Sequence, residues 1–318
     1  MKIVIIGGTG FIGSHVTARL LSLGYDLTLF HRDQTQSDVP PTVPQIHGDR
    51  QNLLAFREEF EDFSPQIVVD MIPFTEHDAS TVMDVFRGVA ERVIAISSMD
   101  VYRAYGCLIR LESGMPHVGS LTEQSPLRER LYPYRDQAKG TADIRYEYEK
   151  ILVERAVLQD PELSGTVLRL PKVYGPGDAQ HHLFGYLKQM DESSSILLEE
   201  GQAQWRWTRG YVENIAEAIA LAATHQAAGY RVYNVGDESA LPEAEWVRRI
   251  GQAASWQGQI KPVPRHVLPD NLALPYDWRH NLAADTSRIR ADLGYTEPVA
   301  EGDALQRTIA WERAHPPF

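Results

Sequence analysis

The feature that most constrains this chain is a glycine-rich turn near its start. The stretch GGTGFIG, residues 7–13, contains four glycines. The apolar run KIVII precedes it and the amphipathic stretch FIGSHVTARLL follows it, so the turn is expected to join a strand to a helix. Because glycine loses more backbone entropy on folding than any other residue, so many of them in one turn require a reason.

In this strand–turn–helix context the glycines match the fingerprint of a dinucleotide-binding fold. Gly7 is expected to allow the tight turn, Gly10 to let a pyrophosphate approach the backbone, and Gly13 to let the helix pack closely on the sheet. Phe11 and Ile12 lie at the helix N-terminus, which offers unpaired N–H groups and positive potential to an anion. A purely structural turn needs only one or two glycines and is the weaker interpretation.

Short apolar runs alternate with helical patterns through the first half of the chain. Strands are predicted at KIVII, DLTLF, QIVVDMI, RVIAISS and TVLRL, with helices between them that include residues 52–63 and 149–159. This pattern predicts an α/β fold with a Rossmann-type, doubly wound parallel sheet. Residues 1–175 would form the NAD(P)-binding domain and residues 176–318 a smaller C-terminal substrate-binding domain, some segments of which return to the sheet. Residues 103–145 show neither helical nor strand periodicity, which is typical of a long functional or disordered loop.

Composition and charge exclude several classes of protein. The net charge of -12 argues against a general nucleic-acid binder, which needs a basic face. The single cysteine, Cys107, rules out an internal disulfide framework and fits a reducing compartment. No apolar stretch is long enough to span a bilayer, and the residues before the glycines are too few for a secretory signal. We therefore expect a cytoplasmic protein with neither nucleic-acid nor membrane partners, and a homodimer stays open as its assembly.

The second predicted strand ends in His31 and Arg32, where NAD-binding folds often carry an acidic residue for the ribose 2′-hydroxyl. An arginine at this place suits a 2′-phosphate, so the sequence favours NADP modestly over NAD. That Arg32 stacks on adenine or faces solvent is nearly as well supported. His181 and His182 lack metal-ligand partners at useful spacing, so no metal site is predicted.

A candidate acid/base pair follows the aperiodic segment. Tyr146 and Lys150 stand in the spacing Y-x-x-x-K within YEYEKILVERAV, which predicts a helix. Residues four apart on a helix share a face, so the phenol and the ammonium are expected to point into one cleft. The cation would lower the pKa of the phenol and make it usable for proton transfer. Tyr148 and Tyr134 fail this test because no lysine lies four residues after either of them.

The glycine turn, Ser98, Tyr146 and Lys150 together resemble the extended short-chain dehydrogenase/reductase family, in particular its NAD-dependent epimerase/dehydratase branch. The resemblance covers nearly the whole chain, through HGDR, ISSMDVY, LRLPKVYGPGD, RGYVENIAEAIALA, YNVGD and DTSRIRADLGY in that order. It implies that Tyr146 is the acid/base, that Lys150 binds the nicotinamide ribose and tunes Tyr146, and that Ser98, rather than Ser97, orients the substrate.

The resemblance also implies binding residues. Asp49 of HGDR is placed near the adenine, and Pro171 and Val173 line the nicotinamide. The expected cofactor-binding set is Gly7, Gly10, Phe11, Ile12, Gly13, His31, Arg32, Asp49, Arg50, Met71, Tyr146, Lys150, Pro171 and Val173. The expected substrate-binding set is Asp100, Tyr134, Arg135, Arg206 and Arg209.

Three departures qualify what the resemblance implies. Met99 and Asp100 stand where the family's sugar-nucleotide dehydratases carry an acidic pair, so one acid is missing and dehydration is disfavoured. Residues 127–145 lengthen the interval before Tyr146, and are expected to form a lid that is mobile without substrate, or equally a surface elaboration. Arg206 and Arg209, in WRWTR, lie near the place where relatives hold a substrate diphosphate, but simple stacking suits them as well.

The expected function is that of an NAD(P)-dependent epimerase or oxidoreductase acting on a nucleotide-activated sugar. Tyr146 would take a hydroxyl proton while the cofactor transiently accepts hydride. One alternative is an NADPH-dependent reductase of a non-nucleotide carbonyl compound, which uses the same residues. Another is a non-catalytic, cofactor-sensing or RNA-associated relative, against which Ser98, Tyr146, Lys150 and the acidic charge all speak.

Overall fold

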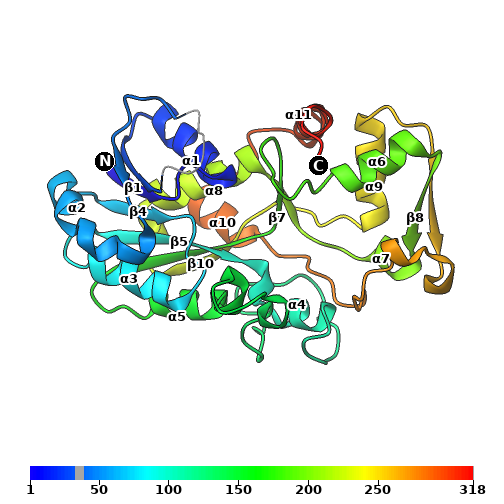
Figure 1. Ribbon diagram of the computed structural model, residues 1–318, viewed down its shortest axis with the longest axis horizontal. Helices are drawn as coiled ribbons and strands as arrows, with labels where there is room; N and C mark the ends of the chain where they lie inside the picture. Colours follow the sequence, from blue (N-terminus) through cyan, green and yellow to red (C-terminus); the bar gives the residue numbers. More distant parts are fainter. Residues whose placement is uncertain (33–38, 318) are drawn as a thin grey trace.

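Seven parallel strands form the main sheet, in the order β10-β6-β5-β4-β1-β2-β3 (Figure 1). The computed structural model describes residues 1–32 and 39–317. The strands are β1 (Lys2–Ile6), β2 (Asp26–His31), β3 (Gln45–His47), β4 (Ile67–Asp70), β5 (Arg92–Ser98), β6 (Ser164–Leu170) and β10 (Arg231–Asn234). The order runs outward in both directions from β1 and β4, and open α/β sheets bind ligands at such a switch point. The predicted Rossmann-type sheet is confirmed.

Side chains alternate along the strands and bury both faces of the sheet. On β1, Ile3 and Ile5 belong to one buried cluster, whereas Val4 and Ile6 belong to another. The helices of the first face are α1 (Phe11–Ser22), α8 (Val212–Thr224) and α10 (Ser287–Leu293), and those of the second are α2 (Arg57–Phe63), α3 (Glu76–Phe86) and α5 (Lys150–Leu158). Covering on both faces explains why these strands are apolar throughout.

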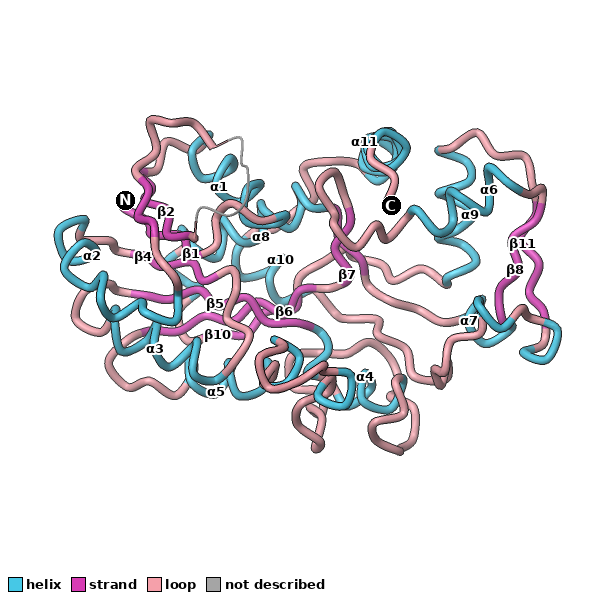
Figure 2. Tube along the Cα trace, in the orientation of Figure 1, coloured by secondary structure: helices cyan, strands magenta, loops and turns pink. Residues whose placement is uncertain are grey.

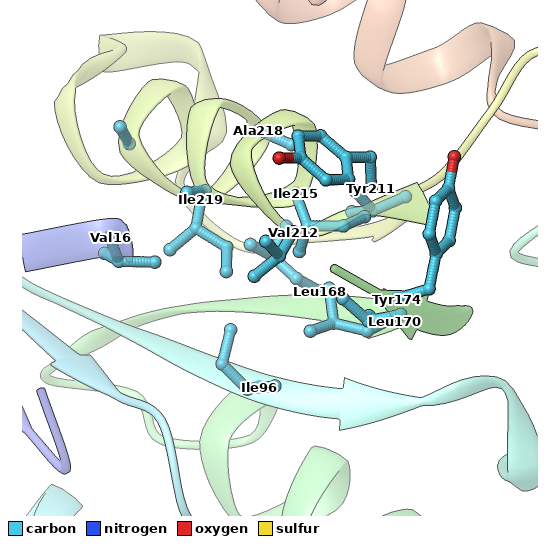
Figure 3. Packing of buried hydrophobic residues seen from close by; sticks show 14 of the residues in the cluster. Val16, Ile96, Leu168, Leu170, Tyr174, Tyr211, Val212, Ile215, Ala218 and Ile219 are labelled. Atoms are coloured by element: carbon cyan, nitrogen blue, oxygen red, sulfur yellow. The ribbon is translucent and has the colours of Figure 1, made fainter. Parts of the chain in front are cut away.

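Helix α8 shows how closely the first face is packed. Ile215 and Ile219 of α8 lie above Ile96 of β5 and Leu168 of β6 (Figure 3). All four side chains are buried. Burial of each such side chain contributes about 1.5–3 kcal/mol, so this contact ties residues after 175 firmly to the sheet.

The residues after 175 divide between two places. Strand β10, α8 and α10 lie in the layers of the main sheet, and the remaining elements form a second, smaller part (Figures 1 and 2). That part contains α6 (Phe184–Glu192), α7 (Glu200–Gln204), α9 (Glu243–Ala253), α11 (Glu301–Ala314) and the parallel pair β8 (Ser195–Glu199) and β11 (Gln259–Val263). A short parallel pair, β7 (Lys172–Tyr174) and β9 (Arg209–Tyr211), lies between the two parts. The boundary at residue 175 remains a prediction.

Two local predictions were wrong. The helix over residues 52–63 is broken, because the 3₁₀ helix η1 (Arg50–Phe56) precedes α2. The aperiodic segment contains a helix, α4 (Arg103–Leu108), which is less than two turns long and too short to produce a visible period. Within the described ranges, no helix has the length and apolar character needed to cross a membrane.

Candidate active site

The glycine turn has the geometry that a dinucleotide pyrophosphate requires. Gly7 adopts φ of 81°, which favours glycine, and a Cβ at Gly13 would lie 2.2 Å from the Gly7 carbonyl oxygen. A Cβ at Gly10 would meet only that oxygen, at 3.9 Å, so the space above Gly10 is open. Helix α1 begins there with no acidic residue in its first turn and no side-chain cap. Its N-terminal N–H groups therefore fit the cofactor's anionic group.

A cavity of about 820 Å³ opens at the carboxyl ends of β1, β4 and β5, beside this turn. Its lining includes the predicted residues Gly7, Gly10, Phe11, Ile12, Gly13, Met71, Ser98, Asp100, Tyr134, Lys150, Pro171 and Val173. The structure thus brings together residues that the sequence spreads over more than 160 positions.

Lys150 is buried beneath this cavity. Its Nζ donates hydrogen bonds to the carbonyl oxygens of Pro73, at 2.7 Å, and Ile96, at 2.8 Å. Nζ also lies 5.7 Å from the centre of the Tyr148 ring. Burial lowers the pKa of Lys150 to about 8. An ammonium has three N–H donors, so one remains for a ligand after these two bonds.

Tyr146 does not lie where the spacing predicts. Helix α5 begins at Lys150, and Tyr146 ends the separate 3₁₀ helix η4 (Ile144–Tyr146), so the two residues share no helical face. The Tyr146 ring lies under the guanidinium of Arg135, 4.8 Å from ring centre to Cζ, and its carbonyl accepts a bond from Arg135 Nε. Tyr146 is absent from the lining of the cavity, whereas Tyr148 is part of it.

A buried ion pair explains the late start of α5. Glu149 has extended backbone and caps the helix, because its carboxylate accepts a bond from the Ile151 N–H at 2.9 Å. The same carboxylate pairs with Arg128 at 2.9 Å, and both side chains are fully buried. Tyr148, one residue before this cap, is therefore outside the helix and turned toward the cavity.

Tyr148 belongs to a group of phenols around Asp100. Its hydroxyl donates to Asp100 Oδ2 at 2.8 Å, and the Tyr134 hydroxyl donates to the same oxygen at 3.1 Å. The Tyr105 and Tyr134 hydroxyls are 2.8 Å apart. Burial and the Asp100 charge raise the pKa of Tyr148 well above its usual value, and a hydrogen bond from Ser98 opposes this effect. The hydroxyls of Ser98 and Tyr148 therefore lie next to each other in the cavity. The Ser97 hydroxyl instead donates to Glu154 at 2.6 Å.

This geometry agrees with the family that the sequence matches. The model of the NAD dependent epimerase/dehydratase family matches residues 3–236. The chain belongs to this family.

Relatives in the epimerase/dehydratase family are distant in sequence. A dTDP-glucose 4,6-dehydratase of Streptomyces niveus is 26% identical, over 98% of this chain and 93% of that protein. A UDP-glucose 4-epimerase of Neisseria gonorrhoeae is 24% identical, over 99% of this chain and 98% of that protein. An uncharacterized Sinorhizobium fredii protein is 25% identical over 52% of this chain, which spans about half, 53%, of that protein's length.

Solved structures confirm the fold. The UDP-glucose 4-epimerase of Thermus thermophilus, in complex with NAD, superposes with a TM-score of 0.70 at 21% identity, over 99% of this chain and 100% of that one. A dTDP-glucose 4,6-dehydratase from Bacillus anthracis, also with NAD, gives a TM-score of 0.71 at 18% identity, over 99% and 97%.

Several residues predicted from the family resemblance lie outside the cavity. The guanidinium of Arg50 pairs with Asp70, at 3.1 Å, and with Asp78, at 2.9 Å. It also donates to the Ile72 carbonyl, so it fastens the β4 end to α3 rather than facing a cofactor. Asp49 caps η1 through the Gln51 N–H.

The remaining residues of the adenine end stay predictions. His31 is buried and its Nε2 lies 2.7 Å from Gln45 Oε1. Arg32 follows β2 directly and is exposed. Both lie at the carboxyl edge of the sheet, the edge where the cavity opens.

The three predicted substrate arginines are also engaged elsewhere. Arg135 is stacked over the Tyr132 and Tyr146 rings. Arg209 is buried, pairs with Glu243 and lies over a tryptophan ring. Arg206 donates to the Ala240 carbonyl and belongs to no part of the cavity lining. Their place in the substrate site therefore remains a prediction.

Lys172 is a cavity residue that the sequence analysis missed. It follows Pro171 on β7 and lies 5.3 Å above the Trp207 ring. Within the described part of the chain, its Nζ donates no hydrogen bond to any group, and burial lowers its pKa to about 8. The pattern LRLPKVYGPGD, which already placed Pro171 and Val173 in the site, contained the signal for it.

Proposed function

We propose that the protein transfers hydride between a nicotinamide cofactor and the carbinol carbon of a nucleotide sugar, with Tyr148 as the acid/base. The observation that carries this proposal is the convergence of Tyr148, Ser98 and Lys150 on one cavity that begins at the glycine turn. Membership of the epimerase/dehydratase family supports a nicotinamide cofactor, and the names of the two full-length relatives, one for dTDP-glucose and one for UDP-glucose, support the substrate class.

The chain's own residues account for binding and proton transfer. The N-terminus of α1, at Gly10 and Phe11, would hold the pyrophosphate of a cofactor that supplies the hydride acceptor. Lys150 would use its remaining N–H for the cofactor ribose, and its charge would stabilise negative charge that develops on the Tyr148 oxygen during proton transfer. Ser98 would orient the substrate oxygen toward Tyr148.

The position of Lys172 in the cavity supports the proposal that the substrate carries negative charge. The Lys172 side chain is half-buried, and its ammonium has no protein acceptor among the described residues, so an anionic ligand would supply one. The diphosphate of a nucleotide sugar has this chemistry. The missing acid at Met99 speaks against dehydration, which leaves epimerisation as the proposed outcome.

A screen of turnover tests this function. The protein is incubated with NAD or NADP and with UDP- and dTDP-hexoses, with simple ketones and aldehydes as a second panel supplied with NADPH. Inversion of one sugar centre without net change in the absorbance of the reduced cofactor supports the epimerase. Net consumption of NADPH with the ketones and aldehydes alone would show that the protein is a reductase and not an epimerase. Cofactor binding without turnover in either panel would contradict both.

A further inference from the structure

Three phenols gather around a single carboxylate oxygen in the cavity. Tyr148 and Tyr134 both donate to Asp100 Oδ2, at 2.8 and 3.1 Å, and Tyr105 joins the chain through Tyr134 at 2.8 Å. Asp100 is 5% exposed. Its other oxygen, Oδ1, is buried and has no hydrogen-bond partner in residues 1–32 and 39–317. The carboxyl group and all three phenols line the cavity.

The surroundings make the ionised form of Asp100 costly. Burial raises the pKa of the carboxyl group, against the opposing effects of Arg128, Tyr148, Lys150 and Tyr134. Neither cation gives the carboxylate a hydrogen bond, because Arg128 is paired with Glu149 and the Nζ of Lys150 donates to two carbonyl oxygens. A carboxylate with one unsatisfied buried oxygen gains more than an ordinary one from taking up a proton.

We propose that Asp100 takes up the proton of Tyr148 while the substrate is oxidised and returns it when the substrate is reduced. The inference rests on the function proposed above. In the oxidising direction, the substrate O–H bond breaks and its proton moves to the Tyr148 oxygen. At the same time the Tyr148 proton moves to Asp100 Oδ2, along the existing 2.8 Å hydrogen bond. The hydride leaves the same carbon for the nicotinamide, so the alcohol loses two electrons and the cofactor gains them.

This arrangement keeps the proton inside the cavity. Tyr148 is a phenol before and after the step, and the only group whose charge changes on the protein is Asp100, which becomes neutral. The stored proton is then available when hydride returns to the substrate, as an epimerisation requires. Asp100 acts through Tyr148, and Tyr134 holds the accepting oxygen in place.

The first test needs no ligand. The infrared spectrum of the protein is titrated with pH, and the spectrum of Asp100→Asn is subtracted to isolate the Asp100 carboxyl band. The matched control is Asp84→Asn, because Asp84 is exposed and its carboxylate pairs with Arg87 on the surface. We expect the protonated band of Asp100 to persist above pH 4, near which an ordinary aspartate titrates, to disappear below the pH of turnover, since only the ionised form can accept a proton, and to shift in frequency in Tyr148→Phe. A band that titrates near pH 4, or that Tyr148→Phe leaves in place, would overturn the proposal.

The second test follows the proton during turnover, with the substrate found in the screen. Asn keeps the shape and the acceptor of Asp100 but takes no proton, so Asp100→Asn should lower kcat at least tenfold with KM within threefold. The wild-type rate in mixed H₂O and D₂O should depend on the square of the D₂O fraction, for two protons in flight, and the variant's rate linearly. A linear wild-type dependence, or a wild-type kcat in Asp100→Asn, would contradict the relay.

A further variant covers the case in which Asp100→Asn does not fold. Tyr134→Phe removes one hydrogen bond to the carboxylate, so the acid limb of the kcat profile should move to higher pH. An acid limb at the wild-type pH would contradict the role of Asp100 as the proton acceptor. If Tyr148→Phe is inactive while the Asp100 and Tyr134 variants behave as wild type, the proposed function stands and the relay fails. If Tyr148→Phe is fully active, the proposed function itself fails.

Discussion

Lys172 differs from the arginines predicted to bind ligands, because the arginines have protein partners and Lys172 has no protein acceptor in the described ranges. Arg50, Arg135 and Arg209 are held in place by carboxylates, carbonyls or rings, so these contacts stabilise the fold. Lys172 has a ring beneath it but no acceptor for its N–H groups in the described ranges. An anionic ligand would supply the hydrogen-bond acceptor that this ammonium lacks.

Lys172→Gln is expected to raise KM for a nucleotide sugar about 10- to 100-fold, because a hydrogen bond to a charged group contributes about 1.5–3 kcal/mol. NAD binding, measured by calorimetry, should be unchanged. The exposed Lys188→Gln on α6 is the matched control and should behave as wild type. An equal loss of NAD affinity would show that Lys172 serves the cofactor instead.

The same lysine predicts a pH dependence. Burial lowers the pKa of Lys172 to about 8, so its ammonium is present below that pH and lost above it. KM should therefore rise as pH increases through about 8, and this rise should be absent in Lys172→Gln. Lys150, whose pKa burial also lowers to about 8, is intact in the variant, so a rise that persists would belong to Lys150.

Arg32 bears on the choice of cofactor. It is exposed at the carboxyl end of β2, the place where a 2′-phosphate would lie. Arg32→Ala is expected to weaken NADP binding at least tenfold and to leave NAD binding nearly unchanged, as measured by calorimetric titration of both. Equal losses for the two cofactors would place Arg32 on the adenine rather than on a phosphate.

At the scale of elements, the ion pair of Arg128 and Glu149 decides where α5 begins and hence which tyrosine reaches the cavity. Glu149→Gln keeps the helix cap but leaves Arg128 buried without its countercharge. The free energy of unfolding, from urea denaturation, should fall by about 3–5 kcal/mol. The exposed pair of Arg57 and Glu61 offers the control Glu61→Gln, which should cost less than about 1 kcal/mol. Similar losses in the two variants would mean that the buried pair does not anchor α5.

The segment of residues 127–145 divides into two stretches. The Arg128 N–H donates to the Val101 carbonyl, the Tyr132 N–H to Glu149, and the Tyr134 hydroxyl to Asp100, so residues 128–134 are fastened to the site. Residues 136–144 have fewer such contacts and several exposed side chains. We expect hydrogen exchange to be slow in 128–134 without ligand, and fast in 136–144 until substrate binds. Fast exchange over both stretches would restore the expectation of one mobile lid.

The sequence predicted the sheet better than the site. Strands β1, β2, β4, β5 and β6 and the glycine turn follow from local patterns, because apolar runs and glycine spacing act over a few residues. The three-residue strand β3 was not predicted, because it is too short to give a pattern. The choice of tyrosine does not, because Glu149 sets the start of α5 through its pair with Arg128, an arginine 21 positions earlier. Asp100 was placed in the substrate site by the family resemblance, and the three phenols near it come from three segments that only the fold brings together.

At the scale of the whole molecule, the cavity joins the two parts of the chain. Gly10, Ser98 and Lys150 come from the main sheet and its helices, and Lys172 and Trp207 come from the segments that lead into the second part. A dinucleotide on the sheet and a substrate near the second part would therefore meet at Tyr148. This placement is the reason that we propose Tyr148, and not the Tyr146 that the spacing predicted, for the proton transfer.

The most direct measurement compares Tyr148→Phe with its matched control Tyr146→Phe, for turnover of the nucleotide sugar and for NAD binding by calorimetry. Removal of a general acid/base typically lowers the rate about 10²–10⁴-fold. We expect a loss of that size in kcat for Tyr148→Phe, with NAD affinity unchanged, and a kcat within threefold of wild type for Tyr146→Phe. The reverse result, an inactive Tyr146→Phe and an active Tyr148→Phe, would contradict the assignment of Tyr148.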